Sequence, residues 1–149
     1  MGRIDRLKGQ GYNLNSLEAT FGFLMHAAWR ETLRMFSEYF DGTDITPQAY
    51  SVLLLIDGNP GCTPGDLSEI MGITSNNMTR LLDDLVARGL ISRCIDGKDR
   101  RARLLRLTDE GMNVLRDLAG RHAAYEAHFH ERLGRERIVQ LCDILARFD

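Results

Sequence analysis

The chain has 149 residues, of which 44% are hydrophobic and 27% charged, and its formal net charge at pH 7 is −2. These values are typical of a soluble globular protein, and the length suits a single domain. No apolar run approaches the ~20 residues of a membrane span, early charges argue against a signal peptide, and three cysteines without paired spacing argue against a disulfide framework. We therefore expect a cytoplasmic protein that does not bind membranes.

Residues 16 to about 40 are predicted to form a long amphipathic helix. Its apolar side chains recur with the helical period and form a stripe too wide for burial on one side only. Two interpretations stay open, namely contact with a partner subunit or one wall of a ligand cleft. The stripe consists of Phe21, Leu24, Met25, Ala28, Trp29, Thr32, Leu33, Met35, Phe36, Tyr39 and Phe40.

A second helix is expected over residues 48 to about 57, after a turn at residues 41–44. Thr46-Pro47 opens this helix, and the apolar run at residues 52–56 assigns it to the core. The sequence Gly-Asn-Pro-Gly at 58–61 ends the helix. Cys62-Thr63 is then a candidate third strand against the hairpin of residues 90–107.

Residues 64–89 indicate two short helices joined by a tight turn. Thr63 suits the N-cap of the first, Pro64 suits its first position, and Gly72 ends it in a left-handed conformation. Thr74 or Ser75 caps the second helix. The predicted buried positions are Leu67, Ile70 and Met71 in the first helix and Met78, Leu81, Leu82, Leu85 and Val86 in the second.

The opposite face of that second helix carries short or forked hydrogen-bonding side chains at its N-terminal end. A recognition helix needs this distribution, because its N-terminal residues reach base edges in the major groove. Asn can pair with adenine and Arg with guanine, while Ser and Thr can contact a base or a phosphate. We therefore predict DNA contact, rather than an ordinary polar surface, for Ser75, Asn76, Asn77, Thr79 and Arg80.

Residues 90–95 and 103–107 predict a two-stranded hairpin with its turn at residues 96–99. Arg100 and Arg101 lie at its tip, and Arg in such an arm commonly enters a narrow minor groove. Residues 75–107 hold eight basic and four acidic residues, a net charge of +4, whereas the rest of the chain has −6. A local basic face suits a DNA-binding protein. The module is a winged helix-turn-helix, in a fold that is mainly α with a small β wing.

Thr108 and the two acidic residues after it predict the start of a helix that runs to about residue 133, and a last helix covers residues 135–148. Both are amphipathic and lie outside the DNA-reading module. We predict one domain, residues 1–149, in which residues 1–44 and 109–149 supply dimerisation helices and residues 45–108 form the module. In a two-fold dimer these helices would hold the recognition helices about 34 Å apart, one turn of DNA.

Residues from about 45 to 118 resemble the MarR family of winged-helix regulators. The matching motifs are ITPQAYSVLLLI, LSEIMGITSNNMTRLLDDLVARGLISR and DGKDRRARLLRLTDEG, of which Asp-Arg-Arg at 99–101 with Leu-Thr-Asp-Glu-Gly at 107–111 is the most specific. The chain departs from the family at Asn76-Asn77, where members often have Ser-Thr. The resemblance implies a triangular homodimer on a pseudo-palindromic operator in double-stranded DNA. It also supports Arg101 as the minor-groove residue, with Asp99 orienting it and Arg100 or Lys98 meeting phosphate.

In that family, small molecules that are often aromatic or phenolic bind between the dimerisation helices and the DNA-reading module. The resemblance implies a similar effector cleft here, in which Arg30 or Arg34 would meet an anionic group. An aromatic carboxylate or its coenzyme-A thioester is the ligand class that we expect. The alternative is that the aromatic residues belong to the core or to a dimer interface. The candidate lining residues are His26, Trp29, Arg30, Phe36, Tyr39 and Tyr50.

His122, Glu126 and His130 recur at i, i+4 and i+8 with His128 nearby, which is compatible with part of a metal site. No cysteine or second cluster completes such a site, so an exposed or interfacial stripe is favoured and no metal or other cofactor is predicted. Redox sensing is disfavoured, because redox-sensing relatives typically carry a cysteine in the first helix and this chain has none there. Known catalytic motifs are missing from the sequence, so we predict no catalytic residue and no enzymatic activity.

The sequence therefore predicts a homodimeric, ligand-responsive transcriptional regulator, most simply a repressor that leaves its operator when a small molecule binds. Two alternatives stay open. One is a redox- or metal-sensing regulator on the same fold. The other is a winged-helix module that binds proteins and not DNA.

Overall fold

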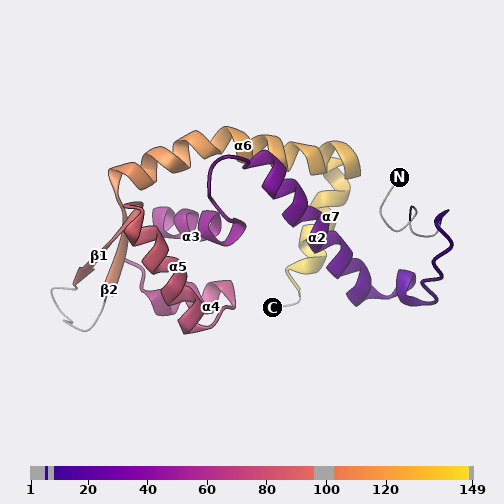
Figure 1. The fold of residues 1–149 in the computed structure, drawn as a ribbon, viewed down its shortest axis with the longest axis horizontal. Helices are drawn as coiled ribbons and strands as arrows, with labels where there is room; N and C mark the ends of the chain where they lie inside the picture. Colours follow the sequence, from indigo (N-terminus) through magenta and orange to yellow (C-terminus); the bar gives the residue numbers. More distant parts are fainter. Residues whose placement is uncertain (1–5, 7–8, 96–102, 148–149) are drawn as a thin grey trace. The chain divides into compact units, whose positions relative to one another are not determined.

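The computed structural model describes residues 6, 9–95 and 103–147 (Figure 1). The predicted fold class is confirmed, because these residues are mainly helical and carry a single two-stranded sheet. The chain divides into two compact units, residues 1–38 and residues 39–149. The prediction of a single domain is not tested by this division and stays a prediction. None of the helices among the described residues is long and apolar enough to span a membrane.

The first unit consists mainly of α2, which spans Phe21–Tyr39 and follows a short 3-10 helix, η1, at Leu17–Ala19. The predicted helix start at Ser16 is therefore wrong. Asn15 has a left-handed backbone with φ of 51°, and Thr20 is extended with φ of −83° and ψ of 134°, so helical geometry is interrupted before Phe21. The Thr20 hydroxyl donates to the Leu17 carbonyl oxygen at 2.9 Å, a local bond that competes with a continuing helix.

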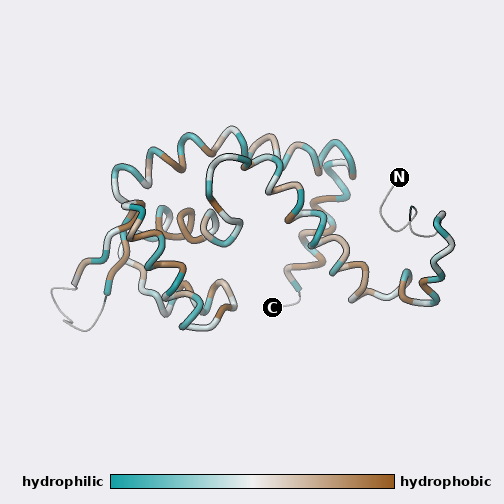
Figure 2. Tube along the Cα trace, viewed as in Figure 1, coloured by the Kyte–Doolittle hydropathy of each residue, from teal (hydrophilic) through white to brown (hydrophobic). Residues whose placement is uncertain are grey.

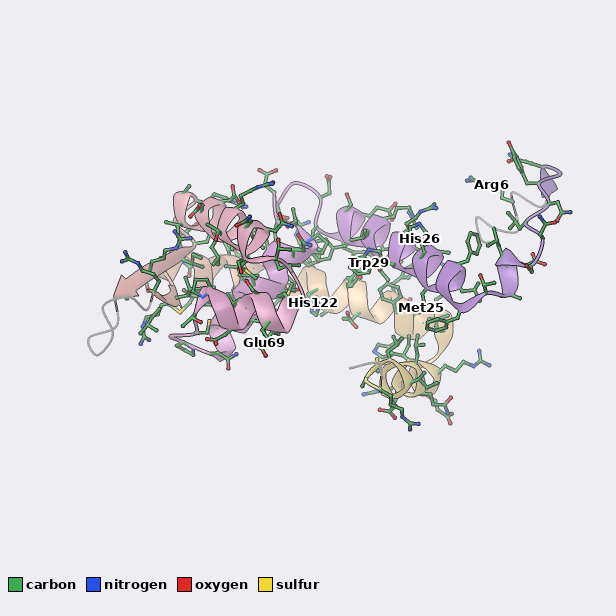
Figure 3. The ribbon with its side chains drawn as sticks, turned by 90° about the horizontal axis from the view of Figure 1, so that it is seen from below. Arg6, Met25, His26, Trp29, Glu69 and His122 are labelled. Atoms are coloured by element: carbon green, nitrogen blue, oxygen red, sulfur yellow. The ribbon has the colours of Figure 1, made fainter. Side chains whose placement is uncertain are left out.

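Much of the apolar stripe of α2 is left uncovered within one chain. Met35 and Phe36 are buried, whereas Phe21 and Trp29 are 56% and 58% exposed. Met25 is also exposed, and Figure 3 shows it on the same helix as His26 and Trp29. The N-terminal part of the stripe that the sequence predicts is therefore exposed, whereas its C-terminal part is buried.

The second unit contains the predicted winged helix-turn-helix and the C-terminal helices. Its elements are α3 (Pro47–Gly58), α4 (Pro64–Met71), α5 (Ser75–Ala87), β1 (Ile91–Ile95), β2 (Arg103–Leu107), α6 (Asp109–Leu133) and α7 (Arg135–Leu145). The last helix was predicted to run to Phe148, but it ends at Leu145. Helix α4 packs against α5, α5 against β1, and α3 against both β2 and α6. Figure 2 shows α3 as hydrophobic along most of its length, as its place between these elements requires.

The core of the second unit draws on every element from α3 to α6. Its buried side chains confirm most of the predicted stripes, but Leu54 of α3, predicted to be core, is 43% exposed, and α4 holds a second exception. Leu67 is 1% exposed, whereas Ile70, which the helical period assigns to the same face, is 62% exposed. The buried hydrophobic residues are Phe40, Ile45, Ala49, Tyr50, Val52, Leu53, Ile56, Leu67, Met78, Leu82, Leu85, Leu90, Ile91, Leu105, Leu115 and Leu118.

Threonine side chains cap α3, α4, α5 and α6, each by accepting a hydrogen bond from a backbone N–H. At α4 the cap is reciprocal. The Asp66 backbone N–H donates to Thr63 Oγ1 at 3.2 Å, and the Thr63 backbone N–H donates to Asp66 Oδ2 at 2.7 Å. Gly72 then ends α4 with a left-handed φ of 61°, so both ends of this helix lie where the sequence predicts them.

The capping box makes the stability of the fold depend on pH through Asp66. The hydrogen bond from the Thr63 backbone holds the pKa of Asp66 below its ordinary value. A carboxylate with a lowered folded-state pKa stabilises the fold above its unfolded pKa of about 3.9, and this contribution is lost as pH falls through the folded pKa. We expect Asp66→Asn to flatten the loss of thermal stability below about pH 4. Melting temperatures of both proteins from pH 7 to pH 3 measure this, and parallel curves would contradict it.

The start of α6 is fixed to the segment that joins α5 to β1. Thr108 Oγ1 donates to the Gly89 carbonyl oxygen at 2.6 Å and accepts from the Gly111 backbone N–H at 3.0 Å. Gly111 is buried, and a Cβ atom built there would lie 2.0 Å from the Leu90 carbonyl oxygen. The motif at residues 107–111 therefore supplies a capping hydroxyl and a residue without a side chain where two backbones meet.

A short backbone bridge links the loop between α3 and α4 to the base of the wing. Gly61 N–H donates to the Leu105 carbonyl oxygen at 2.8 Å, and Leu105 N–H donates to the Cys62 carbonyl oxygen at 2.9 Å. Within the described residues this loop is not a strand, because the sheet contains β1 and β2 alone. The prediction that Cys62-Thr63 forms a third strand is therefore wrong. The predicted position of this segment against the wing is correct.

Candidate nucleic-acid interface

The N-terminal half of α5 carries the predicted DNA-contacting residues on its outer face. Ser75, Asn76, Asn77, Thr79 and Arg80 are all exposed. The Thr79 hydroxyl donates to the Ser75 carbonyl oxygen at 2.8 Å, which leaves its oxygen able to accept a hydrogen bond from outside the helix. The capping hydroxyl of Thr74 accepts from Asn77 N–H at 3.4 Å, so it satisfies one of the unpaired donors at the helix start.

Burial of the opposite face fixes the orientation of α5. Met78, Leu82 and Leu85 are fully buried against the rest of the module. Because residues three and four apart share a helix face, burial of this stripe directs Thr79 and Arg80 away from the core. The spacing of apolar residues in the sequence thus determines which side chains α5 presents to solvent.

Two arginines that the sequence analysis did not single out hold α5 in place. Arg93 Nη1 of β1 lies 2.7 Å from Asp83 Oδ1, which joins the wing to the helix. Arg88 Nη1 lies 3.5 Å from Asp84 Oδ2 and donates to the Asp44 carbonyl oxygen at 3.0 Å. The i, i+4 spacing of Asp84 and Arg88 is visible in the sequence. The pairing of Arg93 with Asp83 depends on the strand position and has no local sequence signal.

The predicted wing residues Lys98, Asp99, Arg100 and Arg101 lie outside the described residues. The base of the wing is described. Arg93 pairs in register with Leu105, and Cys94 with Leu104. Arg103 and Arg106 of β2 are exposed, so the described part of the wing also presents positive charge at its surface.

The candidate effector residues fall in different parts of the chain. His26, Trp29 and Arg30 are exposed on α2 in the first unit, where Phe36 is buried. Tyr39 and Tyr50 belong to the second unit. Of the six candidates, only Tyr39 and Tyr50 therefore lie in the same unit as each other and as α6. The other four stay predictions for a cleft.

Tyr39 and Tyr50 are connected by a series of rings on α6. The ring centroids of Tyr50 and His122 are 5.0 Å apart, those of His122 and Tyr125 are 6.2 Å apart, and those of Tyr125 and Tyr39 are 6.1 Å apart. The Tyr39 hydroxyl lies 3.4 Å from His128 Nδ1. Burial raises the pKa of both Tyr50 and Tyr125, as expected for phenols surrounded by other rings.

The same contacts explain the histidine stripe of α6. His122, labelled in Figure 3, packs against Tyr50 and lies 3.7 Å from Glu126. Within the described chain, no three His, Cys, Asp or Glu side chains lie together in a way that could hold a metal ion. The helical spacing of these histidines therefore corresponds to aromatic packing at His122 and His128.

The three cysteines are unpaired thiols, of which Cys62 is half-buried and Cys94 and Cys142 are exposed. Burial raises the pKa of the Cys62 thiol, and the neighbouring Asp66 carboxylate raises it further. A raised pKa lowers the thiolate fraction and hence the reactivity toward oxidants. The surroundings of Cys62 therefore do not favour redox sensing.

Comparisons with known proteins match this arrangement of helices and wing. A model of the MarR family matches residues 43–102. The transcriptional repressor CouR, in a structure bound to a 23-mer DNA duplex, is 31% identical, with 92% of this chain and 97% of CouR covered and a TM-score of 0.88. The chain belongs to the MarR family. This membership confirms the resemblance and the prediction of a non-enzymatic transcription regulator.

A further relative and a second structure of CouR are also similar to this chain. The multiple antibiotic resistance protein MarR of Escherichia coli K12 is 32% identical over 93 residues, which cover 62% of this chain. The match spans 65% of that protein, slightly less than two thirds of its length. CouR bound to p-coumaroyl-CoA is 29% identical over 91% of this chain and 96% of CouR, with a TM-score of 0.84.

Proposed function

We propose that this MarR-family chain is a homodimeric repressor that binds a pseudo-palindromic operator and releases it when a small molecule binds. The observation that carries the DNA-binding part is the outer face of α5, where five exposed hydrogen-bonding side chains lie opposite a buried apolar stripe. These are the side chains that the major groove can read when the N-terminal half of a recognition helix enters it. The DNA duplex bound to CouR supports the proposal.

Uncovered apolar surface on the flanking helices supports a dimer. Trp29 and Phe21 of α2 are exposed, and so are Val139 and Ile144 of α7, each 53% exposed. Exposed apolar side chains that gather on amphipathic helices mark protein–protein contacts more often than free surface. A two-fold dimer through these helices would place the two copies of α5 about one turn of DNA apart.

The proposed effector is an aromatic carboxylate or its coenzyme-A thioester. The relative CouR has been seen with p-coumaroyl-CoA, which belongs to this class. The candidate effector residues His26, Trp29, Arg30, Phe36, Tyr39 and Tyr50 include aromatic rings and a cation that suit such a molecule. By linkage, the ligand can release DNA only to the extent that it binds the DNA-incompetent dimer more tightly than the DNA-competent one.

The first test is the affinity for a duplex from the upstream region of the protein's own gene, measured by fluorescence anisotropy beside a scrambled duplex. We expect the protein to prefer the upstream duplex. The logarithm of its association constant should fall linearly with the logarithm of the salt concentration. Equal, weak binding to both duplexes would require a selection of binding sites from the whole genome. If that selection also yields no preferred sequence, the chain is not a sequence-specific DNA-binding protein.

Arg80→Ala tests the role of α5 in this binding. Losing a bidentate contact to guanine should weaken operator binding roughly 10- to 100-fold and relax the preference at one base pair. Arg116→Ala is the matched control, because Arg116 is an exposed arginine of α6 in the same unit, hydrogen-bonded to Asn113. Equal affinities of the two variants would show that α5 does not read bases through Arg80.

A further inference from the structure

The two acidic residues of α5 are both engaged by arginines other than Arg80. Asp83 pairs with Arg93 of β1 at 2.7 Å, and Asp84 pairs with Arg88 at 3.5 Å. Because Arg88 also donates to the Asp44 carbonyl oxygen, it is tied to the loop before α3. Among the described residues, Arg80 has neither an ion pair nor a hydrogen bond through its side chain, and it is exposed.

Asp83 would be the natural partner of Arg80 if it were not already paired. The two residues are three positions apart on α5, a spacing that brings side chains onto neighbouring positions of a helix face. A guanidinium that pairs with a carboxylate has fewer donors left for a base edge. An unpaired carboxylate beside the DNA-facing residues would also repel phosphate.

The position of Arg93 on the wing makes its pairing with Asp83 well defined. Arg93 is the middle residue of β1 and lies directly opposite Leu105, which is fully buried. Its own side chain is 32% exposed and that of Asp83 is 57% exposed, so the guanidinium is the more shielded of the two groups. Since α5 packs against β1, the strand carries the guanidinium to the side of the helix.

We propose that Arg93 is a positioning residue for DNA recognition, which holds the Asp83 carboxylate so that the guanidinium of Arg80 stays available for a base. The inference rests on the proposed DNA-binding function. The wing then has a second role besides its own contacts with DNA, because Arg93 in its strand determines whether the guanidinium of Arg80 on α5 is paired. Arg93 itself need not touch DNA.

Three variants test the proposal, namely Arg93→Met, Asp83→Asn and the double variant. Methionine keeps an apolar stem over the strand but removes the charge, and asparagine keeps the shape of aspartate without its charge. We expect Arg93→Met to weaken operator binding at least ~5-fold, the lower end for one lost bidentate contact, and to relax preference at the base pair read by Arg80. Asp83→Asn alone should bind as the wild type does. The double variant should regain wild-type affinity to within about 3-fold, because Asp83 has lost its charge and Asp84, the other acidic residue of α5, stays paired with Arg88.

The rescue by Asp83→Asn separates this role from a merely structural one. If the ion pair served only to hold the wing, Asp83→Asn would weaken binding as much as Arg93→Met, and the double variant would not recover. That result would overturn the proposal. Arg116→Met is the control for the loss of one positive charge, and melting temperatures of all variants show whether the fold persists.

A measurement without DNA keeps the proposal distinct from the proposed function. The side-chain Nε–H resonance of Arg80 in nitrogen-15 spectra reports ion pairing in the free protein. It should shift in Arg93→Met and return to its wild-type position in the double variant, and an unshifted resonance would overturn the proposal. A wild-type protein that prefers no operator would instead contradict the proposed function, while this resonance would still decide whether Arg93 controls Arg80.

Discussion

Gly111→Ala is expected to destabilise the protein by about 3 kcal/mol or more, which is at or beyond the upper end of typical overpacking costs. The added Cβ would lie 2.0 Å from the Leu90 carbonyl oxygen and 3.0 Å from its carbon. Both are backbone atoms, so a change of side-chain rotamer cannot relieve the contact. The start of α6 would have to move away from Leu90, and the hydrogen bond from Thr108 N–H to the Leu90 carbonyl oxygen, 3.1 Å long, would be strained or lost.

Chemical denaturation of Gly111→Ala beside Gly120→Ala measures this effect. Gly120 lies in the same helix, is exposed, and has nothing within 4 Å of the position of an added Cβ. There, alanine should stabilise the protein by about 0.5–1 kcal/mol, because it favours the helix more than glycine does. Similar shifts of the two midpoints would show that the close approach of α6 to Leu90 does not exist in solution.

Leu67→Ala is expected to cost about 2–5 kcal/mol, the usual range for a fully buried leucine. Leu67 is 1% exposed and comes from α4, which packs against both α5 and β2. Its removal would leave a cavity behind the recognition helix, so we expect operator affinity to fall together with stability. The free energy of unfolding from urea denaturation gives the stability term directly.

Ile70→Ala is the matched control on the same helix. Ile70 is 62% exposed, so its truncation should change stability by no more than about 0.5 kcal/mol. The sequence pattern alone treats Leu67 and Ile70 as equivalent, whereas the structure assigns them opposite outcomes. Equal losses from the two variants would mean that α4 is rotated relative to its described orientation.

The elements of the second unit could be predicted from the sequence because their boundaries are encoded locally. Thr63, Pro64 and Gly72 each act through the backbone within a few residues, so the limits of α4 needed no knowledge of the fold. The start of α2 could not be predicted in the same way. Leu17 continues the helical period four residues before Phe21, the first residue of the apolar stripe, and the extended conformation of Thr20 breaks the helix without a proline or glycine at that position.

In the candidate site, too, some features could be predicted from the sequence and others could not. The exposed polar face of α5 follows from helix geometry once Met78, Leu82 and Leu85 are assigned to the core. The ion pair between Asp83 and Arg93 depends on which strand residue lies beside α5, and this is decided by tertiary packing. The spacing of His122 and Glu126 favoured an exposed or interfacial stripe over a metal site, but it could not indicate that the ring of Tyr50, more than seventy residues earlier in the chain, packs against His122.

The backbone bridge between residues 61–62 and Leu105 has a consequence for self-association. A strand at the edge of a sheet exposes unpaired N–H and C=O groups, which can template pairing with another chain and lead to aggregation. At Leu105, β2 pairs with β1 on one side and with the Gly61–Cys62 backbone on the other. The base of this two-stranded ribbon is therefore closed to intermolecular strand addition at Leu105. It can display the arginine side chains of β2 in solution without offering that part of its backbone to a neighbouring molecule.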